Sequence, residues 1–366
     1  MSLGIYVHIP FCRSKCPYCD FYSEAGARRE RMEAYAGELA AQIREYAPLA
    51  SGRVVETIYI GGGTPTVMPR ELLLGVIGAV KDSYELAVNA EFTAEANPAS
   101  ADSEYLSALR RVGVNRLSLG MQSSSDEELR RLGRAHKYAS FLESLKAARE
   151  AGFANLSVDL MYGIPSQTRA SFAASLKAAL AASPEHISIY SLKLEPGTPF
   201  FERGETLPLP GEEEERAMYF DAINALTRAG YAQYEISNFA RPGFECRHNL
   251  NYWDCGEYLG FGAGAHSFFG GRRYSFKPSL TGFGGEIGED GSNIGREGEY
   301  VMLAMRRAQG IGKTAFGERF GRDFDEAYRG AMEPFIESGH IVADGSGYRL
   351  TPEGMYVSNY ILARII

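Results

Sequence analysis

Basic residues form no run anywhere in this 366-residue sequence, and the net charge is −8. Proteins hold nucleic acids and anionic membranes through clustered Lys and Arg side chains that displace counterions. Long apolar stretches are also missing, and none reaches the roughly 20 residues that a membrane-spanning helix needs. We therefore expect no nucleic-acid partner and no transmembrane segment, whereas peripheral membrane contact remains open.

Cysteine is sparse, with five residues in the chain, and no signal peptide precedes the first strand-like segment. Both features predict a cytoplasmic protein with reduced thiols. Cys12, Cys16 and Cys19 nevertheless lie together in the segment HIPFCRSKCPYCDFYS. A closed zinc site or an ordinary iron–sulfur cluster uses four protein ligands, so three thiolates around a [4Fe–4S] cluster leave one iron open to a small molecule. The alternatives are a zinc site that takes a fourth ligand such as His8, and three free thiols.

The pattern of apolar residues predicts an α/β fold with a parallel sheet. Strands are expected near residues 4–9, 54–60, 90–96, 114–120, 155–160 and 186–192, with a seventh near 233–237. Helical spacing is found at 28–46, 103–112, 138–150, 169–182 and 212–230. Six clear strand–helix units favour a partial (β/α)6 barrel over a doubly wound open sheet.

Three regions are expected along the chain. Residues 1–275 would form the barrel with its C-terminal extension, and the Gly-rich segment 276–299 reads as a linker. Residues 300–366 return to helical patterns with a hairpin around 344–347, which predicts a small α+β domain of winged-helix type. Because this tail is not basic, we expect it to serve packing or partner contact rather than DNA binding.

Polar or glycine-rich motifs follow each predicted strand. Chemistry in parallel α/β folds is found on the loops at the carboxyl ends of strands, so these motifs should meet at one rim. They are the cysteine loop, GGGTPT (61–66), EANP (95–98), GMQS (120–123), DLMYGIP (159–165) and SLKLEPGTP (191–199). The glycine run lacks the Lys–Ser/Thr of a phosphate-binding loop, and instead allows close approach of backbone to a ligand.

Taken together, these motifs resemble a known family. YVHIPFCRSKCPYCDF resembles the radical S-adenosylmethionine (SAM) signature, and GGGTPT, EANP, NRLSLGMQS, LGRAH, DLMYGIPSQT, YSLKLEPGTPF and HNLNYW follow in the order of the HemN/HemW family. That family includes oxygen-independent coproporphyrinogen III dehydrogenases and haem chaperones. The resemblance implies that Cys12, Cys16 and Cys19 hold a [4Fe–4S] cluster whose fourth iron is chelated by SAM, and that the reduced cluster splits SAM into methionine and a 5′-deoxyadenosyl radical.

The resemblance also implies which residues bind SAM. These are Tyr6, Tyr18, Gly62, Gly63, Thr64, Glu95, Gln122, Arg134 and Asp159. The last three match positions that serve a second SAM molecule in the dehydrogenase branch. A zwitterionic amino acid and a ribose need acceptors and a cation, which this set offers. For Arg134 and Asp159, the alternative is a buried ion pair between two loops.

The segment HNLNYW, from His248 to Trp253, resembles the HNxxYW motif of the haem chaperone branch. The resemblance implies a haem site with His248, Asn249, Tyr252 and Trp253, since imidazole ligates iron and aromatic rings face a macrocycle. The chemistry alone favours a structural histidine satisfied by the backbone. Other candidate haem ligands are His266 and Cys246.

Two features separate the branches of the family. The dehydrogenases carry a further cysteine two residues after the third cysteine of the signature, where this chain has Phe21, and they have a longer segment before the first strand. We therefore expect a haem chaperone that delivers haem to haem-requiring proteins. The alternative is an oxygen-independent coproporphyrinogen III dehydrogenase, which would convert coproporphyrinogen III to protoporphyrinogen IX.

Overall fold

The computed structural model describes residues 3–98, 100–288 and 296–366. Six parallel strands form the centre of a 12-stranded sheet, in chain order: β1 (Leu3–Ile9), β4 (Val54–Gly62), β5 (Glu85–Ala96), β6 (Arg116–Gln122), β7 (Leu156–Tyr162) and β8 (His186–Ser191). A doubly wound sheet would reverse its strand order at a switch point. Because these six strands are neighbours in the order of the chain, the partial barrel is confirmed.

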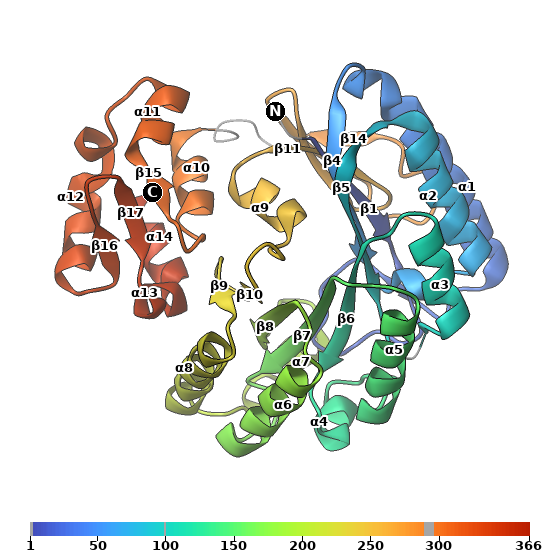
Figure 1. Cartoon of the computed structure of the whole chain (residues 1–366), viewed down its shortest axis with the longest axis horizontal. Helices are drawn as coiled ribbons and strands as arrows, with labels where there is room; N and C mark the ends of the chain where they lie inside the picture. Colours follow the sequence, from blue (N-terminus) through green and yellow to red (C-terminus); the bar gives the residue numbers. More distant parts are fainter. Residues whose placement is uncertain (1–2, 99, 289–295) are drawn as a thin grey trace.

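The outer face of the curved sheet is covered by helices (Figure 1). They are α1 (Arg29–Tyr46), α2 (Arg70–Ser83), α3 (Ser103–Arg111), α4 (Asp126–Arg131), α5 (Tyr138–Glu150), α6 (Arg169–Ala181) and α8 (Glu212–Arg228), whereas the short helix α7 (Pro199–Arg203) packs against the cysteine loop. All five helices expected from apolar spacing begin and end within two residues of their predicted bounds. Helix α2 was missed, although it carries the same kind of apolar stripe.

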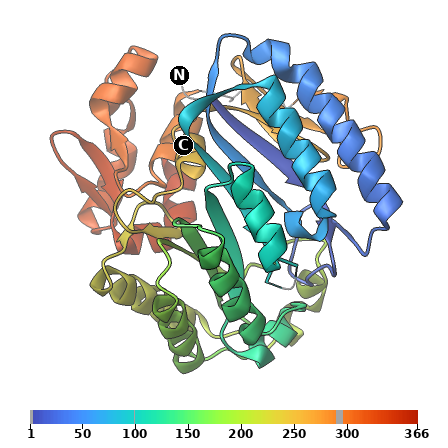
Figure 2. The same ribbon diagram turned by 45° about the vertical axis from the view of Figure 1, so that its right-hand side comes forward.

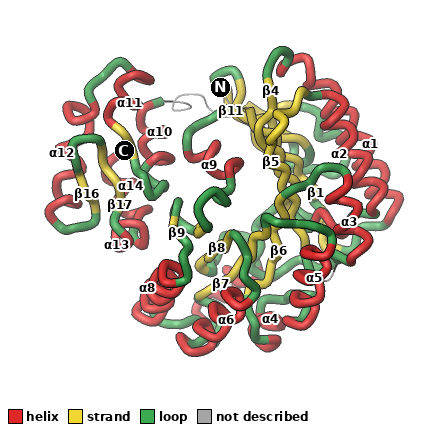
Figure 3. The backbone as a smooth tube through the Cα atoms, in the orientation of Figure 1, coloured by secondary structure: helices red, strands yellow, loops and turns green. Residues whose placement is uncertain are grey.

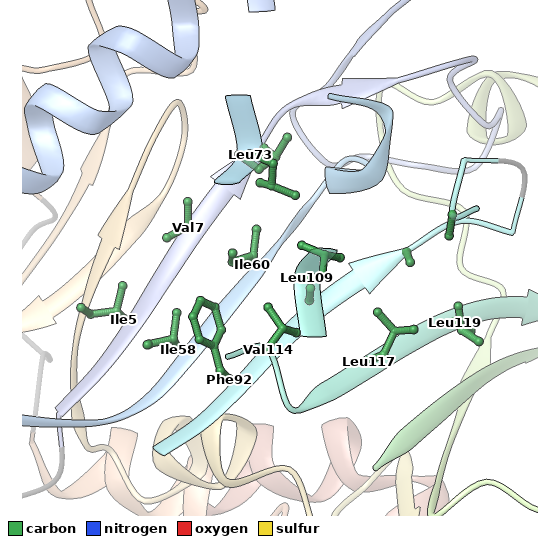
Figure 4. Close-up of a cluster of buried hydrophobic side chains, with 14 of the residues drawn as sticks. Ile5, Val7, Ile58, Ile60, Leu73, Phe92, Leu109, Val114, Leu117 and Leu119 are labelled. Atoms are coloured by element: carbon green, nitrogen blue, oxygen red, sulfur yellow. The ribbon is translucent and has the colours of Figure 1, made fainter. Parts of the chain in front are cut away.

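The core lies between the sheet and this helical layer (Figure 4). Ile5 and Val7 of β1 and Ile58 and Ile60 of β4 point to the same side of the sheet and are fully buried, and Leu73 of α2 packs there as well. Successive side chains of a strand point to opposite faces. The residues between these apolar ones therefore face the inside of the barrel, where the site is found.

Shorter strands extend the sheet at both edges. On one side β10 (Asn238–Ala240) pairs antiparallel with β8, and β9 (Ala232–Gln233) pairs antiparallel with β10. On the other side β11 (Glu257–Phe261) runs parallel to β1 and leads into antiparallel β12 (His266–Phe269), β13 (Arg272–Phe276) and β14 (Glu286–Gly288). The short strands β2 (Phe11–Cys12) and β3 (Glu24–Ala25) flank the cysteine loop.

The predicted strand at 233–237 is wrong. The backbone N–H of Tyr234 donates to the carbonyl of Asn238, and the Glu235 carboxylate accepts from the N–H of Ser237 at 3.1 Å. These bonds close a hairpin turn over the residues that were expected to be extended. The alternation of apolar and polar residues at 233–237 therefore belongs to a turn between β9 and β10, and not to one extended strand.

Half of the predicted linker belongs to the barrel. Leu280 and Phe283 are 3% and 0% exposed, and the ring of Phe283 lies 5.0 Å from that of Tyr35 in α1. Strand β14 then pairs with β13. The linker prediction is wrong for residues 276–288, because two large side chains in this Gly-rich stretch are enough to anchor it. Residues 289–295 lie outside the described residues.

The C-terminal region has its own core. It contains α10 (Glu297–Ala304), β15 (Ile311–Gly312), α11 (Lys313–Phe320), α12 (Phe324–Glu337), β16 (Ile341–Ala343), β17 (Gly347–Leu350), α13 (Pro352–Tyr356) and α14 (Ser358–Ile365). Strands β16 and β17 form the expected hairpin. This region lies on the concave side of the large sheet, with the short helix α9 (Arg247–Trp253) between them (Figures 1 and 2). Within the described ranges no helix is long and apolar enough to cross a membrane.

Candidate functional site

The inner face of the barrel lines a cavity of about 950 Å³. Alternate residues of each strand face this space, and the strand register places Glu95 beside Ser118 and Gly120 beside Asp159. Except for Tyr6, every residue predicted to bind the cluster or SAM lines it: Cys12, Cys16, Tyr18, Cys19, Gly62, Gly63, Thr64, Glu95, Gln122, Arg134 and Asp159. Segments far apart in the sequence thus converge on one space, as the strand-end rule predicts.

The cysteine loop forms one wall of the cavity. Cys12, Cys16 and Cys19 are half-buried free thiols, and burial raises the pKa of Cys19 to about 11. His8 is not a fourth ligand, because its Nε2 and Nδ1 lie 2.9 Å from the Tyr22 carbonyl and 3.0 Å from the hydroxyl of Tyr6. Three soft thiol donors facing a cavity fit a [4Fe–4S] cluster with an open iron. No group of three or more Cys, His, Asp or Glu side chains able to hold a single metal ion is present in the described part of the chain.

The glycine run lies directly against the start of the cysteine loop. The N–H groups of Gly63 and Thr64 donate to the carbonyls of Ile9 and Phe11 at 2.9 and 2.7 Å. A Cβ atom at Gly63 would lie 2.8 Å from the Phe11 carbonyl oxygen, and Gly62 has φ = +109°. Glycine is therefore required here for close contact between two backbone segments.

Glu95 lies on β5 below the glycine run. The hydroxyl of Tyr59 donates to its Oε1 at 2.8 Å. Burial raises the pKa of Glu95 to about 7, and the negative charge of Asp159 adds to this effect. The carboxyl group would therefore meet the ammonium group of an amino-acid ligand well, since a cation restores the ionised form.

Glu95→Gln is expected to become more stable relative to the wild type as the pH rises from 4.5 to 7. The folded wild type binds a proton at Glu95 more tightly than the unfolded chain does, so its free energy of unfolding falls across this window. The variant does not lose stability in this way. The difference in the free energy of unfolding between variant and wild type therefore grows by up to about 3 kcal/mol, because the pKa of Glu95 is raised from 4.5 to about 7. Urea unfolding of the apoprotein at several pH values measures it. Glu143→Gln, at an exposed position of α5, should follow the wild type; a constant difference for Glu95→Gln would contradict the prediction.

Arg134 spans the cysteine loop and β6. Its Nη1 donates to the Cys16 thiol at 3.8 Å and to the Tyr18 hydroxyl at 3.5 Å, and its Nη2 donates to the Gly120 carbonyl at 3.4 Å. Asp159 instead accepts from the Ser118 hydroxyl at 3.1 Å. The two are not joined by an ion pair in the described structure, which argues against the alternative of a structural salt bridge.

Gln122 ends β6 with a backbone φ of +62°. A residue other than glycine seldom adopts this left-handed conformation outside turns and functional sites. The strain is held in place by the neighbouring strand β7, whose register with β6 shifts at this point. Gln122 therefore projects from an irregular strand end into the cavity.

The HNLNYW segment forms helix α9, which Figure 3 shows as a short helix between loops. The Glu91 carboxylate of β5 accepts from the N–H groups of Arg247 and His248 at 2.9 and 3.0 Å. His248 is 1% exposed, and its ring nitrogens lie 2.9 Å from the Thr57 hydroxyl and 2.8 Å from the Tyr252 hydroxyl. Burial lowers the pKa of His248 to about 3. Its imidazole is neutral and fully hydrogen-bonded, so iron ligation would require α9 to move.

Only one predicted haem residue faces the cavity. Asn249 lines it, whereas His248, Tyr252 and Trp253 are not among its lining residues. The far end of α9 is held by the C-terminal domain, where Arg307 forms an ion pair with Asp254 and Arg319 donates to the Asp254 carbonyl at 3.2 Å. The haem role of this segment therefore remains a prediction.

Several cavity residues were missed in the sequence. Arg116, Ser157, His186 and Tyr190 lie on the inner faces of β6, β7 and β8. Arg116 stands six positions before Gln122 and Ser157 two before Asp159, so the alternation within a strand could have found them. Strand β8 carries no predicted site residue, so the sequence offered no such signal for His186 and Tyr190. The C-terminal domain adds 355–359, which no local pattern connects with the barrel.

Comparison with known proteins agrees with this geometry. Residues 6–179 match the model of the radical SAM superfamily, and residues 298–357 match that of the HemN C-terminal domain. The chain is 36% identical to the heme chaperone HemW of Bacillus subtilis, across 99% of this chain and 98% of that protein. It is 40% identical to the heme chaperone HemW of Escherichia coli, across 72% of this chain and 69% of that protein.

A solved structure shares the fold. Coproporphyrinogen III oxidase (HemN) from Escherichia coli superposes with a TM-score of 0.85 over 100% of this chain and 90% of that one, at 23% sequence identity. Similarity at this level of identity shows the fold alone. With the full-length similarity to the HemW relatives, it leads to one assignment: the chain belongs to the radical SAM HemN/HemW family, whose members use a [4Fe–4S] cluster and SAM.

Proposed function

We propose that this protein is a haem chaperone, which binds haem in the cytoplasm and delivers it to haem-requiring proteins. One observation carries the proposal. The chain is 36% identical to the heme chaperone HemW of Bacillus subtilis over nearly the full length of both proteins. The relative of the same name from Haemophilus influenzae is 34% identical across 98% of this chain.

The cavity supports this proposal. Its volume of about 950 Å³ is at the upper end for small-molecule sites, so it can take a bulky ligand. Phe21 lines the cavity and is 62% exposed at the position where the dehydrogenases carry a further cysteine. An exposed aromatic ring at a cavity wall suits contact with a flat apolar macrocycle.

The cofactor residues have distinct tasks in this proposal. Cys12, Cys16 and Cys19 would hold the cluster, while Gly62, Gly63 and Thr64 would meet the methionine part of SAM and Glu95 its ammonium group. When bound, the cluster and SAM supply an electron and a carbon-centred radical. The protein's own contribution is to position these groups in a cavity closed on one side by the C-terminal domain.

A radical dehydrogenase of coproporphyrinogen III is the second candidate. The observation that favours it is the convergence of all the SAM-site residues but Tyr6 on one cavity. A protein that only carried haem would not need these residues in place. Phe21 argues against it, because the additional cysteine of the dehydrogenases is absent.

Paired assays on the reconstituted protein separate the two functions. We expect stoichiometric haem binding by difference spectroscopy, and no oxidised porphyrinogen when coproporphyrinogen III, SAM and a reductant are supplied under anaerobic conditions. His248→Ala should weaken haem binding at least tenfold if imidazole ligates iron, since a metal–ligand bond is lost.

A matched variant controls for packing. Thr57→Val removes the hydroxyl that bonds Nδ1 of His248 but leaves the imidazole in place. It should bind haem like the wild type; an equal loss in both variants would show that α9 packing, and not ligation, is responsible. Product formation with SAM consumption and no specific haem binding would overturn the chaperone proposal.

A further inference from the structure

We infer that Arg116, on the inner face of β6, binds a carboxylate group of the cargo. This inference rests on the proposed function for the identity of the cargo, and for haem the carboxylate is a propionate. The bond is a bidentate pairing of the guanidinium group with the two carboxylate oxygens, a geometry for which Arg is well suited.

Arg116 is a buried cation without a hydrogen-bond partner. It begins β6, pairs in register with Thr93 of β5 and is 2% exposed, yet it lines the cavity. Its Nε is buried without a partner, and no hydrogen bond or ion pair of its guanidinium group occurs in residues 3–98, 100–288 and 296–366. A guanidinium group has five N–H donors, and leaving such a charge unpaired in the interior is unfavourable.

The nearby carboxylates are committed to other donors. Glu91 accepts from the N–H groups that begin α9, Glu95 from the Tyr59 hydroxyl and Asp159 from the Ser118 hydroxyl. Their negative charge helps to keep Arg116 in the protein interior, but none of them supplies a hydrogen bond to it. The guanidinium donors therefore remain available to a ligand in the cavity.

The walls near Arg116 suit the body of a carboxylate-bearing aromatic ligand. Tyr59 and His186 line the cavity, and both interact electrostatically with the Arg116 guanidinium group. His186 is neutral, because burial lowers its pKa, and its nitrogens lie 2.8 Å from the hydroxyls of Ser157 and Tyr234. His186 therefore adds no positive charge beside Arg116.

The second buried cation of the cavity, Arg134, contacts the cysteine loop. Arg134 donates to the carbonyl of Gly120, four residues further along β6, and to the Cys16 thiol. Four residues of a strand span about 13 Å. Arg134 is thus committed to the cysteine loop and to β6, whereas Arg116 is close to Glu95 and Asp159 without a hydrogen bond to either, which leaves its donors for a carboxylate of a ligand in the cavity.

The test compares haem with haem dimethyl ester, in which both propionates are neutral, on the reconstituted full-length protein. We expect the wild type to bind the ester about 10- to 100-fold more weakly, as the loss of a charge-assisted bidentate pair predicts. Arg116→Gln should bind haem about as weakly as the wild type binds the ester, and should no longer distinguish the two ligands. Arg116→Lys, which retains the charge, should keep part of the preference. Iron content and SAM binding report whether the variants keep their fold.

Lys193→Gln is the matched control, because Lys193 also lines the cavity but is exposed. Equal affinity of the wild type for haem and its ester would overturn the inference, as would loss of the preference in Lys193→Gln but not in the Arg116 variants. If Arg116→Gln does not fold, the inference is tested by the affinities of the wild type and of Arg116→Lys for haem and for its dimethyl ester. If the wild type binds no haem, the proposed function fails, and coproporphyrin with its tetramethyl ester tests Arg116 in the same way.

Discussion

Cys16→Ser is expected to leave the reconstituted protein without its [4Fe–4S] cluster. The structure supplies three thiols at the cavity wall, and the imidazole of His8 already contacts Tyr6 and the Tyr22 carbonyl. With one thiolate removed, a second iron of the cluster would lack a thiolate ligand. Cys12→Ser and Cys19→Ser should behave alike. Iron and acid-labile sulfide per chain, together with the visible spectrum, measure the loss, which should approach the full cluster content.

Cys246→Ser is the matched control for this experiment. Cys246 is fully buried, and its thiol donates to Glu91 at 3.5 Å instead of facing the cysteine loop. Its replacement should leave the iron content unchanged. Iron at the wild-type level in Cys16→Ser, or a loss in Cys246→Ser equal to that of the loop variants, would show that the cluster is held elsewhere. Because Cys246 is also a candidate haem ligand, the same variant reports on that role in the haem assay.

Gly63→Ala is expected to abolish SAM binding and to reduce cluster content severely. The added Cβ would lie 2.8 Å from the Phe11 carbonyl oxygen and 2.9 Å from its nitrogen. Both are backbone atoms of the residue before Cys12, so relief of the clash must displace the cysteine loop or the glycine run. Overpacking of this kind costs about 1–3 kcal/mol. Isothermal calorimetry with SAM and iron analysis measure the functional effect, and urea unfolding measures the effect on stability.

Gly75→Ala separates this clash from the general effect of replacing glycine. Gly75 is exposed on α2, and an added Cβ would meet no atom within 4 Å. Alanine is favoured over glycine within helices by about 1 kcal/mol, so this variant should be slightly more stable than the wild type and bind SAM normally. Unchanged SAM binding in Gly63→Ala would contradict the close packing of the two backbone segments.

The sequence was informative about regular elements because each has one buried face. The apolar stripes of α1, α3, α5, α6 and α8 and the alternation in the six parallel strands follow directly from burial against one side of the sheet. It was misleading where few residues decide the structure. The hairpin at 232–240 depends on bonds made by Glu235 and Tyr234, and residues 276–288 are anchored by two buried side chains in a Gly-rich stretch.

The residues of the candidate site that lie at or after the ends of strands were predictable from the sequence, whereas several of those within the strands were missed. Motifs at strand ends interrupt the apolar pattern, so the cysteine loop, the glycine run and Glu95 stand out in the sequence. Arg116 and His186 lie within strands, where a single polar residue looks like an ordinary inner-face position. Residues 355–359 reach the cavity only because the C-terminal domain packs on the concave side, a long-range contact that local patterns do not encode.

Helix α9 and the residue after it are bonded to two parts of the protein. Its first turn is bonded to Glu91 of the barrel, and the residues after its last turn are held by Arg307 and Arg319 of the C-terminal domain. The free energy needed to expose His248 therefore includes contacts from both domains. By thermodynamic linkage, a partner that binds the C-terminal domain and weakens these arginine contacts would change haem affinity without entering the cavity. In the haem chaperone that we propose, release of cargo would in this way be conditional on the presence of its recipient.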